Sequence, residues 1–341
     1  MKFKAAVLEK LNAPLAVREV ETTEIQPGQV LVKVLTSGLC GAQLHEIRGH
    51  KGNGKFLPHL MGHEGCGLVQ EVAPAVSTVK PGDKVVMHWR PTDGIDAPFP
   101  KYILNGKQIS SGKVTTISEY SVVSENRLTA VPQDTPNDLC ALLGCGLTTA
   151  LGVIDNDVDL KFGESVMVIG CGGVGLNLIQ GAKLKSAHPI VAVDVVDSKK
   201  EQAITAGADS FINPMNEDLS LLSADVIIDT TGNTKAIAAA TQCLSNKGRL
   251  VLVGQPAPGT EVNIPNGVSL FSGVGRSIKA SQGGKTNPAE DIPRYVKMHA
   301  AGIINIENLV THRFGLDSVN EAFDLLRTGK AGRIMIDLGD K

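Results

Sequence analysis

The sequence predicts an α/β protein with two domains, a barrel-like and largely antiparallel β domain and a doubly wound domain built around a parallel sheet. Three observations predict this class. The chain has 341 residues, more than one hydrophobic core usually holds. Its first third consists of short Val- and Leu-rich runs separated by Pro and Gly. From about residue 147, apolar strand-like runs alternate with helix-like stretches, which is typical of βαβ units.

The expected strands of the first third lie between turn signals. They are KAAVLEK (4–10), LAVREVE (15–21), QVLVKVL (29–35), GLVQEV (67–72) and DKVVMHW (83–89). The sequence Lys80-Pro81-Gly82-Asp83 marks the turn before the last of them. Residues 90–116 have no clear period, so we expect a long irregular excursion there, followed by a strand at 117–123.

The second domain begins where the pattern changes. We expect strands at 164–169, 190–194, 224–229, 249–254 and 270–274, with helices at 176–185 and 234–244 between them. Ser198 is a candidate N-cap for a further helix that would end at Gly207. Short connections between such strands predict a parallel sheet with helices on both faces. From about residue 285 the chain returns to mixed helix and strand.

The composition excludes several classes of function. Hydrophobic residues make up 42% and charged residues 20%, the net charge is −2, and no run of Lys or Arg suggests a nucleic-acid surface. No apolar run approaches the roughly 20 residues of a membrane-spanning helix. The first residues, MKFKAAVLEK, lack the apolar core of a signal peptide, so a cytoplasmic protein is expected. The six cysteines are spread along the chain, as expected of buried thiols with a minority as ligands.

A glycine-rich motif predicts a dinucleotide site. Gly170-Cys171-Gly172-Gly173-Val174-Gly175 follows an apolar strand and precedes a helix, and its glycines permit a tight turn, close approach of a pyrophosphate, and packing of helix on strand. Asp194 ends the next strand, where a carboxylate accepts hydrogen bonds from ribose hydroxyls. That carboxylate would repel a 2′-phosphate, so NAD is favoured over NADP. A glycine-rich turn without any ligand is the alternative.

Three residues form a candidate metal site. Cys40, His63 and Cys145 offer two thiolates and an imidazole, a donor set suited to Zn²⁺ that leaves one position open, as in catalytic zinc sites. Glu64 follows His63 directly. The separations of 23 and 82 residues are not diagnostic, so buried cysteines with a hydrogen-bonded histidine remain an alternative at this point.

The chain resembles the zinc-containing medium-chain dehydrogenase/reductase family, the alcohol dehydrogenase group, along nearly its whole length. The motifs that carry this resemblance are Ser37-Gly38-Leu39-Cys40-Gly41, Gly62-His63-Glu64-Gly65, Val79-Lys80-Pro81-Gly82-Asp83-Lys84-Val85, Gly144-Cys145-Gly146, the glycine motif and Gly332-Arg333. The resemblance implies a GroES-like barrel domain (1–146 and 283–341) and a Rossmann domain (147–282).

The resemblance also implies roles for individual residues. Cys40, His63 and Cys145 would bind a catalytic zinc, with Glu64 beside it and able to enter its coordination transiently. Zinc would act as a Lewis acid on the oxygen of an alcohol or carbonyl substrate, in a cleft between the domains, while hydride passes to or from the nicotinamide. Thr149 would pack by the nicotinamide and Arg333 would contact the pyrophosphate. The predicted cofactor-binding residues are Gly170, Gly172, Gly173, Val174, Gly175, Asp194, Lys199, Thr149, Val253 and Arg333.

The chain departs from the family pattern in three ways. It has no cysteine between Cys66 and Cys140, so the family's four-cysteine structural zinc site is excluded and one catalytic zinc is expected. Ala42 stands where a Ser or Thr usually begins the proton relay, although His45 matches a histidine that ends it in some members. Gln43 replaces an Asp that usually orients a zinc ligand. These changes favour a polyol, a sugar or another functionalised alcohol that brings its own hydroxyl.

Two other functions stay open at this stage. One is a biosynthetic carbonyl reductase acting on a sugar or nucleotide-linked substrate. The other, from a different class, is a binding protein that senses NAD without zinc chemistry. The resemblance further implies a homodimer or homotetramer that pairs through the Rossmann sheets, and the apolar stretch 268–274 is a candidate edge for that pairing.

Overall fold

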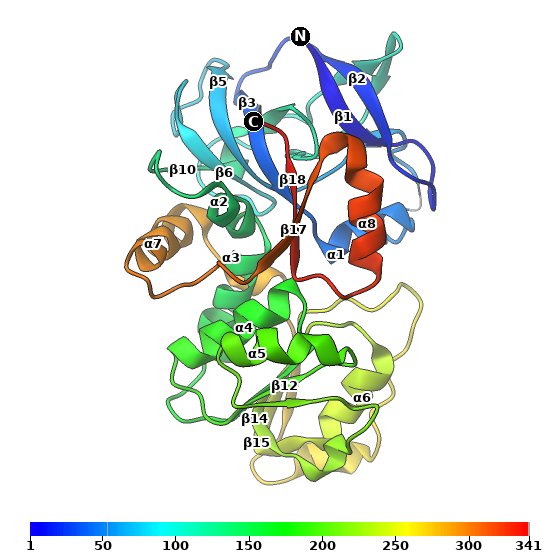
Figure 1. The fold of residues 1–341 in the computed structure, drawn as a ribbon, viewed down its shortest axis with the longest axis vertical. Helices are drawn as coiled ribbons and strands as arrows, with labels where there is room; N and C mark the ends of the chain where they lie inside the picture. Colours follow the sequence, from blue (N-terminus) through cyan, green and yellow to red (C-terminus); the bar gives the residue numbers. More distant parts are fainter. Residues whose placement is uncertain (53, 340–341) are drawn as a thin grey trace. The chain divides into compact units, whose positions relative to one another are not determined.

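The computed structural model describes residues 1–52 and 54–339, which fold as two compact units (Figure 1). The first unit contains residues 1–148 and 287–341, and the second contains residues 149–286. Helix α3 (Gly146–Gly152) contains the boundary between them. The predicted α/β class is confirmed, with one mainly antiparallel unit and one parallel unit.

Two sheets make up the β structure of the first unit. One has the strand order β4 (His59–Leu60), β1 (Lys2–Leu8), β2 (Ala16–Thr22), β7 (Tyr102–Leu104) and β8 (Lys107–Ile109). The other has the order β10 (Leu128–Val131), β6 (Lys84–His88), β5 (Glu64–Val72), β3 (Gln29–Gly38), β18 (Arg333–Asp337) and β17 (Val310–Gly315), with β9 (Tyr120–Ser124) also paired to β3. The C-terminal strand β18 thus returns to lie beside β3, which ends next to Cys40.

The helices of the first unit lie at the ends and sides of these sheets (Figure 1). They are α1 (Gly41–Ile47), α2 (Asn137–Leu143), α7 (Pro288–Ala300) and α8 (Val319–Arg327), with the short 3₁₀ turns η1 (Glu125–Arg127) and η7 (Leu316–Ser318). The apolar face of α8, with Val319, Ala322 and Phe323, belongs to the same buried core as Val32, Val34 and other strand residues. This core holds in place the strand ends that carry the candidate site.

The second unit has a six-stranded parallel sheet. Its order is β13 (Ser210–Ile212), β12 (Ile190–Val193), β11 (Val166–Ile169), β14 (Ala224–Asp229), β15 (Leu244–Leu252) and β16 (Ser277–Ala280). In chain order this is 3-2-1-4-5-6, the arrangement of a Rossmann fold. Strand β11 and residues 226–228 of β14 are continuous buried apolar runs, as expected when helices cover both faces.

The helical segments of this unit lie before, between and after its strands. They are α4 (Gly173–Leu184), α5 (Lys200–Thr205) and α6 (Thr234–Gln242), the π-helical segment η2 (Val153–Val158), and the short turns η3 (Asp197–Lys199), η4 (Leu219–Leu221), η5 (Gly267–Phe271) and η6 (Gly283–Lys285). The side chain of Asn233 caps α6 by accepting the backbone N–H groups of Lys235 and Ala236.

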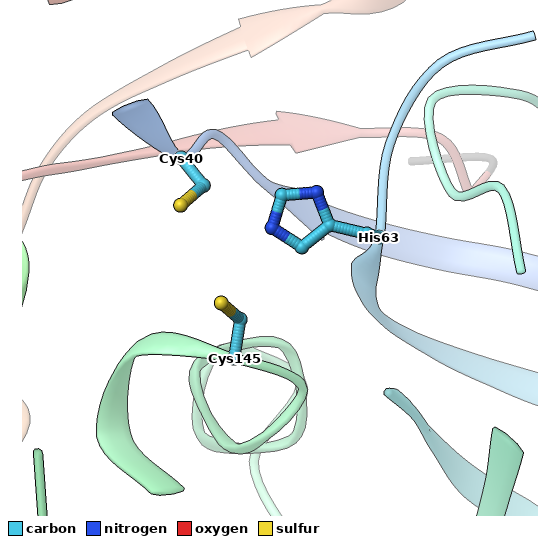
Figure 2. A group of neighbouring side chains, drawn as sticks. All are labelled: Cys40, His63 and Cys145. Carbon is cyan, nitrogen blue, oxygen red and sulfur yellow. The ribbon is translucent and has the colours of Figure 1, made fainter. Parts of the chain in front are cut away.

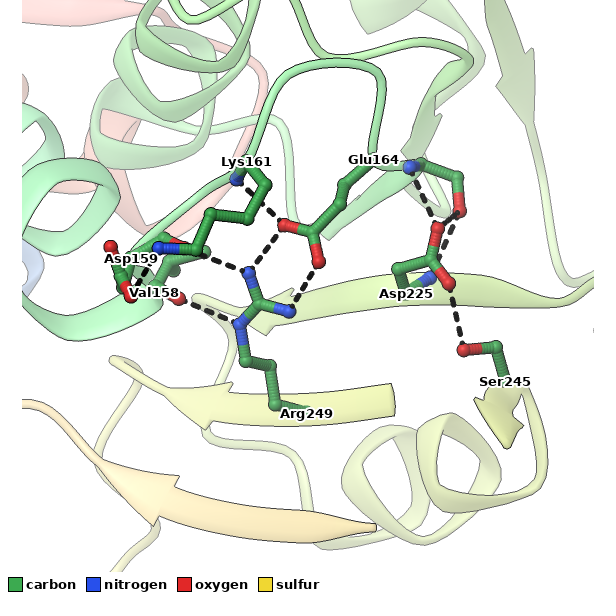
Figure 3. A network of polar contacts seen from close by, with 8 residues as sticks. Val158, Asp159, Lys161, Glu164, Asp225, Ser245 and Arg249 are labelled. Carbon is green, nitrogen blue, oxygen red and sulfur yellow. Dashed lines mark hydrogen bonds and ion pairs between the residues drawn. The ribbon is translucent and has the colours of Figure 1, made fainter. Parts of the chain in front are cut away.

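A polar network anchors the start of β11 to its neighbours in this unit (Figure 3). Arg249 on β15 binds both carboxylate oxygens of Glu164, at 2.9 and 2.6 Å, and donates to the carbonyl of Val158. Asp225 accepts the hydroxyls of Ser165 and Ser245, each at 2.8 Å. These bonds connect β11, β14 and β15 at one end of the sheet.

Two predictions about local structure in the second unit are wrong. Residues 270–274 do not form a strand, because Gly273 and Gly275 adopt positive φ angles of 63° and 93° that an extended strand does not allow. The sixth strand is β16 instead. The helix after β12 begins at Lys200, so Ser198 lies in the preceding 3₁₀ turn and is not its N-cap.

The excursion at 90–116 contains a β-hairpin that the sequence analysis missed. Strands β7 and β8 pair across Asn105 and Gly106, both at positive φ, and β7 joins β2 at the edge of the first sheet. Asn-Gly between apolar residues is a strong hairpin signal that could have revealed it. The Glu125 carboxylate orders the start of the segment by accepting the backbone N–H of Ile95 at 2.8 Å, together with those of Ser77 and Thr78.

In the described part of the chain, no single helix is long and apolar enough to cross a membrane. One bent pair, residues 137–143 with 146–158, passes that test by length and composition alone.

Candidate active site

Cys40, His63 and Cys145 converge on one point of the first unit, although they come from distant parts of the chain (Figure 2). Cys40 follows β3 and is the N-cap of α1, His63 directly precedes β5, and Cys145 lies between α2 and α3. Their two sulfur atoms and one ring nitrogen all lie within 4.8 Å of one another. Ligands about 2.0–2.3 Å from a tetrahedral zinc ion would have separations of this order.

Glycines beside the ligands allow this convergence. Gly62 has a φ of +101°, and a Cβ atom there would lie 2.5 Å from the Thr116 hydroxyl oxygen. At Gly144 a Cβ atom would lie 2.5 Å from the carbonyl oxygen of Met87. Side chains at these two positions would therefore push the His63 and Cys145 segments away from the neighbouring strands.

The two thiols interact directly and shift each other's pKa in opposite directions. Their mutual hydrogen bond lowers the pKa of Cys40 well below its ordinary value and raises the pKa of Cys145. His63 beside Cys40 also favours the thiolate, and so lowers the pKa of that thiol further. A cation among these donors would replace the proton of the hydrogen bond between the thiols, and two sulfurs with one imidazole suit zinc while leaving a position open for substrate.

An ion pair between Glu64 and Arg333 lies beside this cluster. Both side chains are almost fully inaccessible, and the Arg333 Nη2 atom donates to Glu64 Oε1. The backbone N–H of Gly146 donates to the other carboxylate oxygen at 3.3 Å. Burial raises the pKa of Glu64, and the Arg333 guanidinium opposes that rise. The Nε atom of Arg333 has no hydrogen-bond partner among the described residues.

His45 is not part of the three-residue cluster. It lies on α1, where its Nδ1 atom is 3.3 Å from His50 Nδ1 and the two rings meet edge to face. Burial, with help from the charges of His50 and Arg48, lowers the pKa of His45. Ala42, one turn earlier on α1, offers no hydroxyl between His45 and the cluster.

The glycine motif has the geometry of a phosphate-binding turn. Gly170 directly follows β11 and has a φ of +94°. A Cβ atom at Gly175 would lie 1.8 Å from the Gly170 carbonyl oxygen, so no larger residue fits there. Gly172 is the N-cap of α4, and a Cβ atom on it would meet nothing within 4 Å. The backbone N–H groups of Gly173 and Val174 in the first turn lack acceptors within the helix, as at any helix start, and can bind phosphate.

Asp194 is already oriented toward this turn. One carboxylate oxygen accepts the backbone N–H of Cys171 at 2.7 Å, and the other accepts that of Val196 at 2.9 Å. The charge of Asp194 partly offsets the burial that lowers the pKa of Lys199, so the structure brings these two residues together.

The remaining predicted cofactor residues lie in the second unit. Thr149 is buried on α3, and Val253 directly follows β15, where its N–H donates to the Asp229 carbonyl at 2.8 Å. Two features escaped sequence reasoning. No local signal could have paired Glu64 with Arg333, which are 269 positions apart. The contact between Gln43 and Cys40 could have been predicted, because a Gln three positions after an N-cap residue is typical of a capping box.

Comparisons with known proteins agree with this geometry. A family model described as "Alcohol dehydrogenase GroES-like domain" matches residues 26–133, and one described as "Zinc-binding dehydrogenase" matches residues 173–301. The chain is 33% identical to alcohol dehydrogenase 6 of Peromyscus maniculatus, with 98% of each chain covered. It is 31% identical to S-(hydroxymethyl)glutathione dehydrogenase of Paracoccus denitrificans, covering 98% of this chain and 100% of that one.

The chain belongs to the zinc-containing alcohol dehydrogenase family. Solved structures share the fold. An alcohol dehydrogenase zinc-binding domain protein from Burkholderia ambifaria superimposes with a TM-score of 0.91 at 25% identity over 100% of both chains. The benzyl alcohol dehydrogenase of Acinetobacter calcoaceticus gives 0.89 at 24% identity, over 99% of this chain and 100% of that one.

Membership of this family decides the class of function. The protein is a zinc-dependent oxidoreductase that acts on alcohols or carbonyl compounds. Its relatives are curated alcohol dehydrogenases, so the alternative of a binding protein without catalysis is not retained.

Proposed function

We propose that this alcohol dehydrogenase uses NAD to oxidise a polyol, a sugar or another functionalised alcohol, or to reduce the matching carbonyl compound. The observation that carries the proposal is the convergence of Cys40, His63 and Cys145 on one point. Zinc held by these residues would supply a Lewis acid for the substrate oxygen. Glu64 and Arg333 would balance the charge beside the cluster.

The second unit supports NAD as the cofactor. The turn at Gly170, Gly172, Gly173, Val174 and Gly175 leaves open space and free N–H groups for a pyrophosphate. Asp194 presents a carboxylate for ribose hydroxyls, which disfavours a 2′-phosphate. We further assign Lys199 to the ribose end of the cofactor, Thr149 and Val253 to the nicotinamide end, and the spare N–H of Arg333 to a phosphate oxygen.

Ala42 supports a substrate with an extra hydroxyl. A proton that leaves the substrate oxygen must reach His45 or bulk water, and the methyl group of Ala42 cannot pass it on. A second hydroxyl on the substrate, or a water molecule held by it, could bridge this gap. Simple unbranched primary alcohols lack that group, so we expect them to be poor substrates.

Zinc content and a substrate panel test the proposal. We expect about one zinc ion per subunit by elemental analysis. We also expect NAD reduction to be roughly 100-fold faster with polyols or sugar derivatives than with unbranched primary alcohols, the low end of what a positioned proton carrier contributes. Protein with zinc but no such preference would overturn the substrate class. Protein that binds NAD without zinc or turnover would overturn the site assignment.

Two variants of nearly equal shape make the panel sharper. Ala42→Thr introduces a hydroxyl, and Ala42→Val introduces the same volume without one. Ala42→Thr should raise kcat/KM for unbranched primary alcohols about 100-fold, and Ala42→Val should not. Equal behaviour of the two variants would show that a missing hydroxyl does not limit these substrates.

Exposed apolar side chains support self-association through the second unit. Val268, Phe271 and Val274 are 72%, 83% and 77% exposed. Three large apolar residues within seven positions form the kind of patch that usually binds a partner. We therefore propose a homodimer or homotetramer.

The six free thiols agree with the cytoplasmic location expected from the sequence.

A further inference from the structure

Gln43 makes a reciprocal contact with Cys40. Its side chain is fully buried on α1, three positions after Cys40, and its Oε1 atom accepts the Cys40 backbone N–H at 2.8 Å. In return, the backbone N–H of Gln43 donates to the Cys40 carbonyl oxygen at 3.0 Å and lies close to the Cys40 side chain. This is a capping box, in which the N-cap residue and the third helical residue bind each other's backbone.

The contact restrains both parts of Cys40. The amide oxygen of Gln43 accepts its backbone N–H, and the backbone N–H of Gln43 donates to its carbonyl oxygen, so the backbone that carries the sulfur is fixed on both sides. The box normally requires Glu or Gln at its third position. The shorter Asp, usual at this position in the family that the chain resembles, has one methylene group less to reach back.

The side-chain amide of Gln43 acts as a hydrogen-bond acceptor and not as a donor. Its oxygen has a partner, but its Nε2 atom is buried and has no hydrogen-bond partner among the described residues. The structure therefore uses the side chain of Gln43 as a hydrogen-bond acceptor for Cys40. A neutral amide also adds no negative charge near Cys40, Cys145 and Glu64.

We propose that Gln43 is a positioning residue that holds Cys40 in the orientation required for metal binding. This inference rests on the proposed function, because it takes Cys40 as a zinc ligand. Gln43 acts through the capping box, and it needs no contact with substrate or cofactor. A Gln three positions after Cys40 in the sequence therefore indicates that this metal-binding cysteine is held in its orientation before the metal binds.

The test measures metal binding rather than turnover. Gln43→Met keeps the length of the side chain but removes the acceptor, and should weaken zinc binding about 10- to 100-fold in competition with a chromophoric chelator. Cobalt(II) substituted for zinc in the same variant should show altered sulfur-to-metal charge-transfer bands. Wild-type zinc affinity and an unchanged cobalt spectrum in folded Gln43→Met would overturn the proposal.

Two further variants separate positioning from folding. Gln43→Glu keeps the acceptor oxygen and should retain the wild-type cobalt spectrum, so loss of metal from folded Gln43→Glu would also overturn the proposal. Gln29→Met is the matched control, because Gln29 is another buried glutamine of the first unit, bonded to Gln26 and Pro98. It should bind zinc as the wild type does. If the wild-type protein itself binds no zinc, the proposed function fails together with this inference.

Discussion

Each unit contains an arginine–glutamate pair that joins distant parts of the chain, and the two pairs differ in how fully their hydrogen bonds are used. In the second unit, Arg249 binds both oxygens of Glu164 and the carbonyl oxygens of Val158 and Asp159 (Figure 3). In the first unit, Arg333 binds one oxygen of Glu64 and leaves its buried Nε atom without a partner among the described residues.

Burial makes the difference informative. The side chains of Arg249 and Glu164 are both 22% exposed, whereas those of Arg333 and Glu64 are 4% and 0% exposed. A buried donor without a partner lowers the stability of the fold by about 1–3 kcal/mol. The more deeply buried pair, Arg333 with Glu64, therefore has the larger need for hydrogen bonds but makes fewer of them. The satisfied pair stabilises the fold, and the unsatisfied pair supports our proposal that Arg333 binds a ligand.

The largest expected effect comes from Arg333→Met. This variant should raise KM for NAD roughly 100-fold, because the charge-assisted bond to phosphate that we propose for Arg333 would be lost. It should also lower the free energy of unfolding by about 3–5 kcal/mol, because Glu64 is left buried without its partner. Steady-state kinetics and urea unfolding measure the two effects.

The double variant Glu64→Gln with Arg333→Met separates these two consequences. It should regain much of the lost stability but none of the NAD affinity. Unchanged KM in Arg333→Met would contradict the ligand role and reduce Arg333 to a structural partner of Glu64.

A smaller and purely structural effect is expected from Arg249→Met. The change removes four hydrogen bonds of a partly exposed network, and should cost about 2–3 kcal/mol of unfolding free energy. KM for NAD and zinc content should stay within twofold of wild type. A large change in KM would mean that Arg249 also contributes to cofactor binding, so that the two pairs share that role.

The smallest effect concerns pH. The hydrogen bond from Arg249 lowers the pKa of Glu164, with a smaller opposing effect of burial. Because the folded pKa lies below the unfolded value of about 4.3, this carboxylate stabilises the fold above that pH, and its contribution is lost as pH falls through the folded pKa. Glu164→Gln should therefore be about 1 kcal/mol less stable than wild type at pH 7.

That difference should shrink progressively below about pH 4. Urea unfolding of both proteins at pH 7, 5 and 3.5 measures it. A gap that stays constant with pH would show that the charge of Glu164 contributes nothing.

Much of the fold follows from periodicity in the sequence. Strand β14 has the predicted limits, 224–229. The limits of β11, β12 and α4 lie within three residues of the predicted ones. These elements are long or strongly apolar, so local preference and tertiary packing agree. The hairpin at Tyr102–Leu104 and Lys107–Ile109 and the strand β16 were missed, because short edge elements depend on pairing with strands elsewhere in the chain.

The candidate site divides in the same way. The sequence by itself determined the residue types that carry the chemistry: Cys40, His63 and Cys145 in family-like motifs, the glycine turn, and Asp194 at the end of the next strand. Each of these signals is local, a short run of residues whose chemistry can be read without knowing what lies nearby.

Only the tertiary structure decided which of these residues meet and which bonds they make. It brought Glu64 to Arg333 across 269 positions and left the Arg333 Nε atom free of partners among the described residues. It also gave the Gln43 oxygen to the Cys40 backbone. The physical reason is that hydrogen bonds inside a protein depend on direction and burial, and both arise only when sheets and helices pack together.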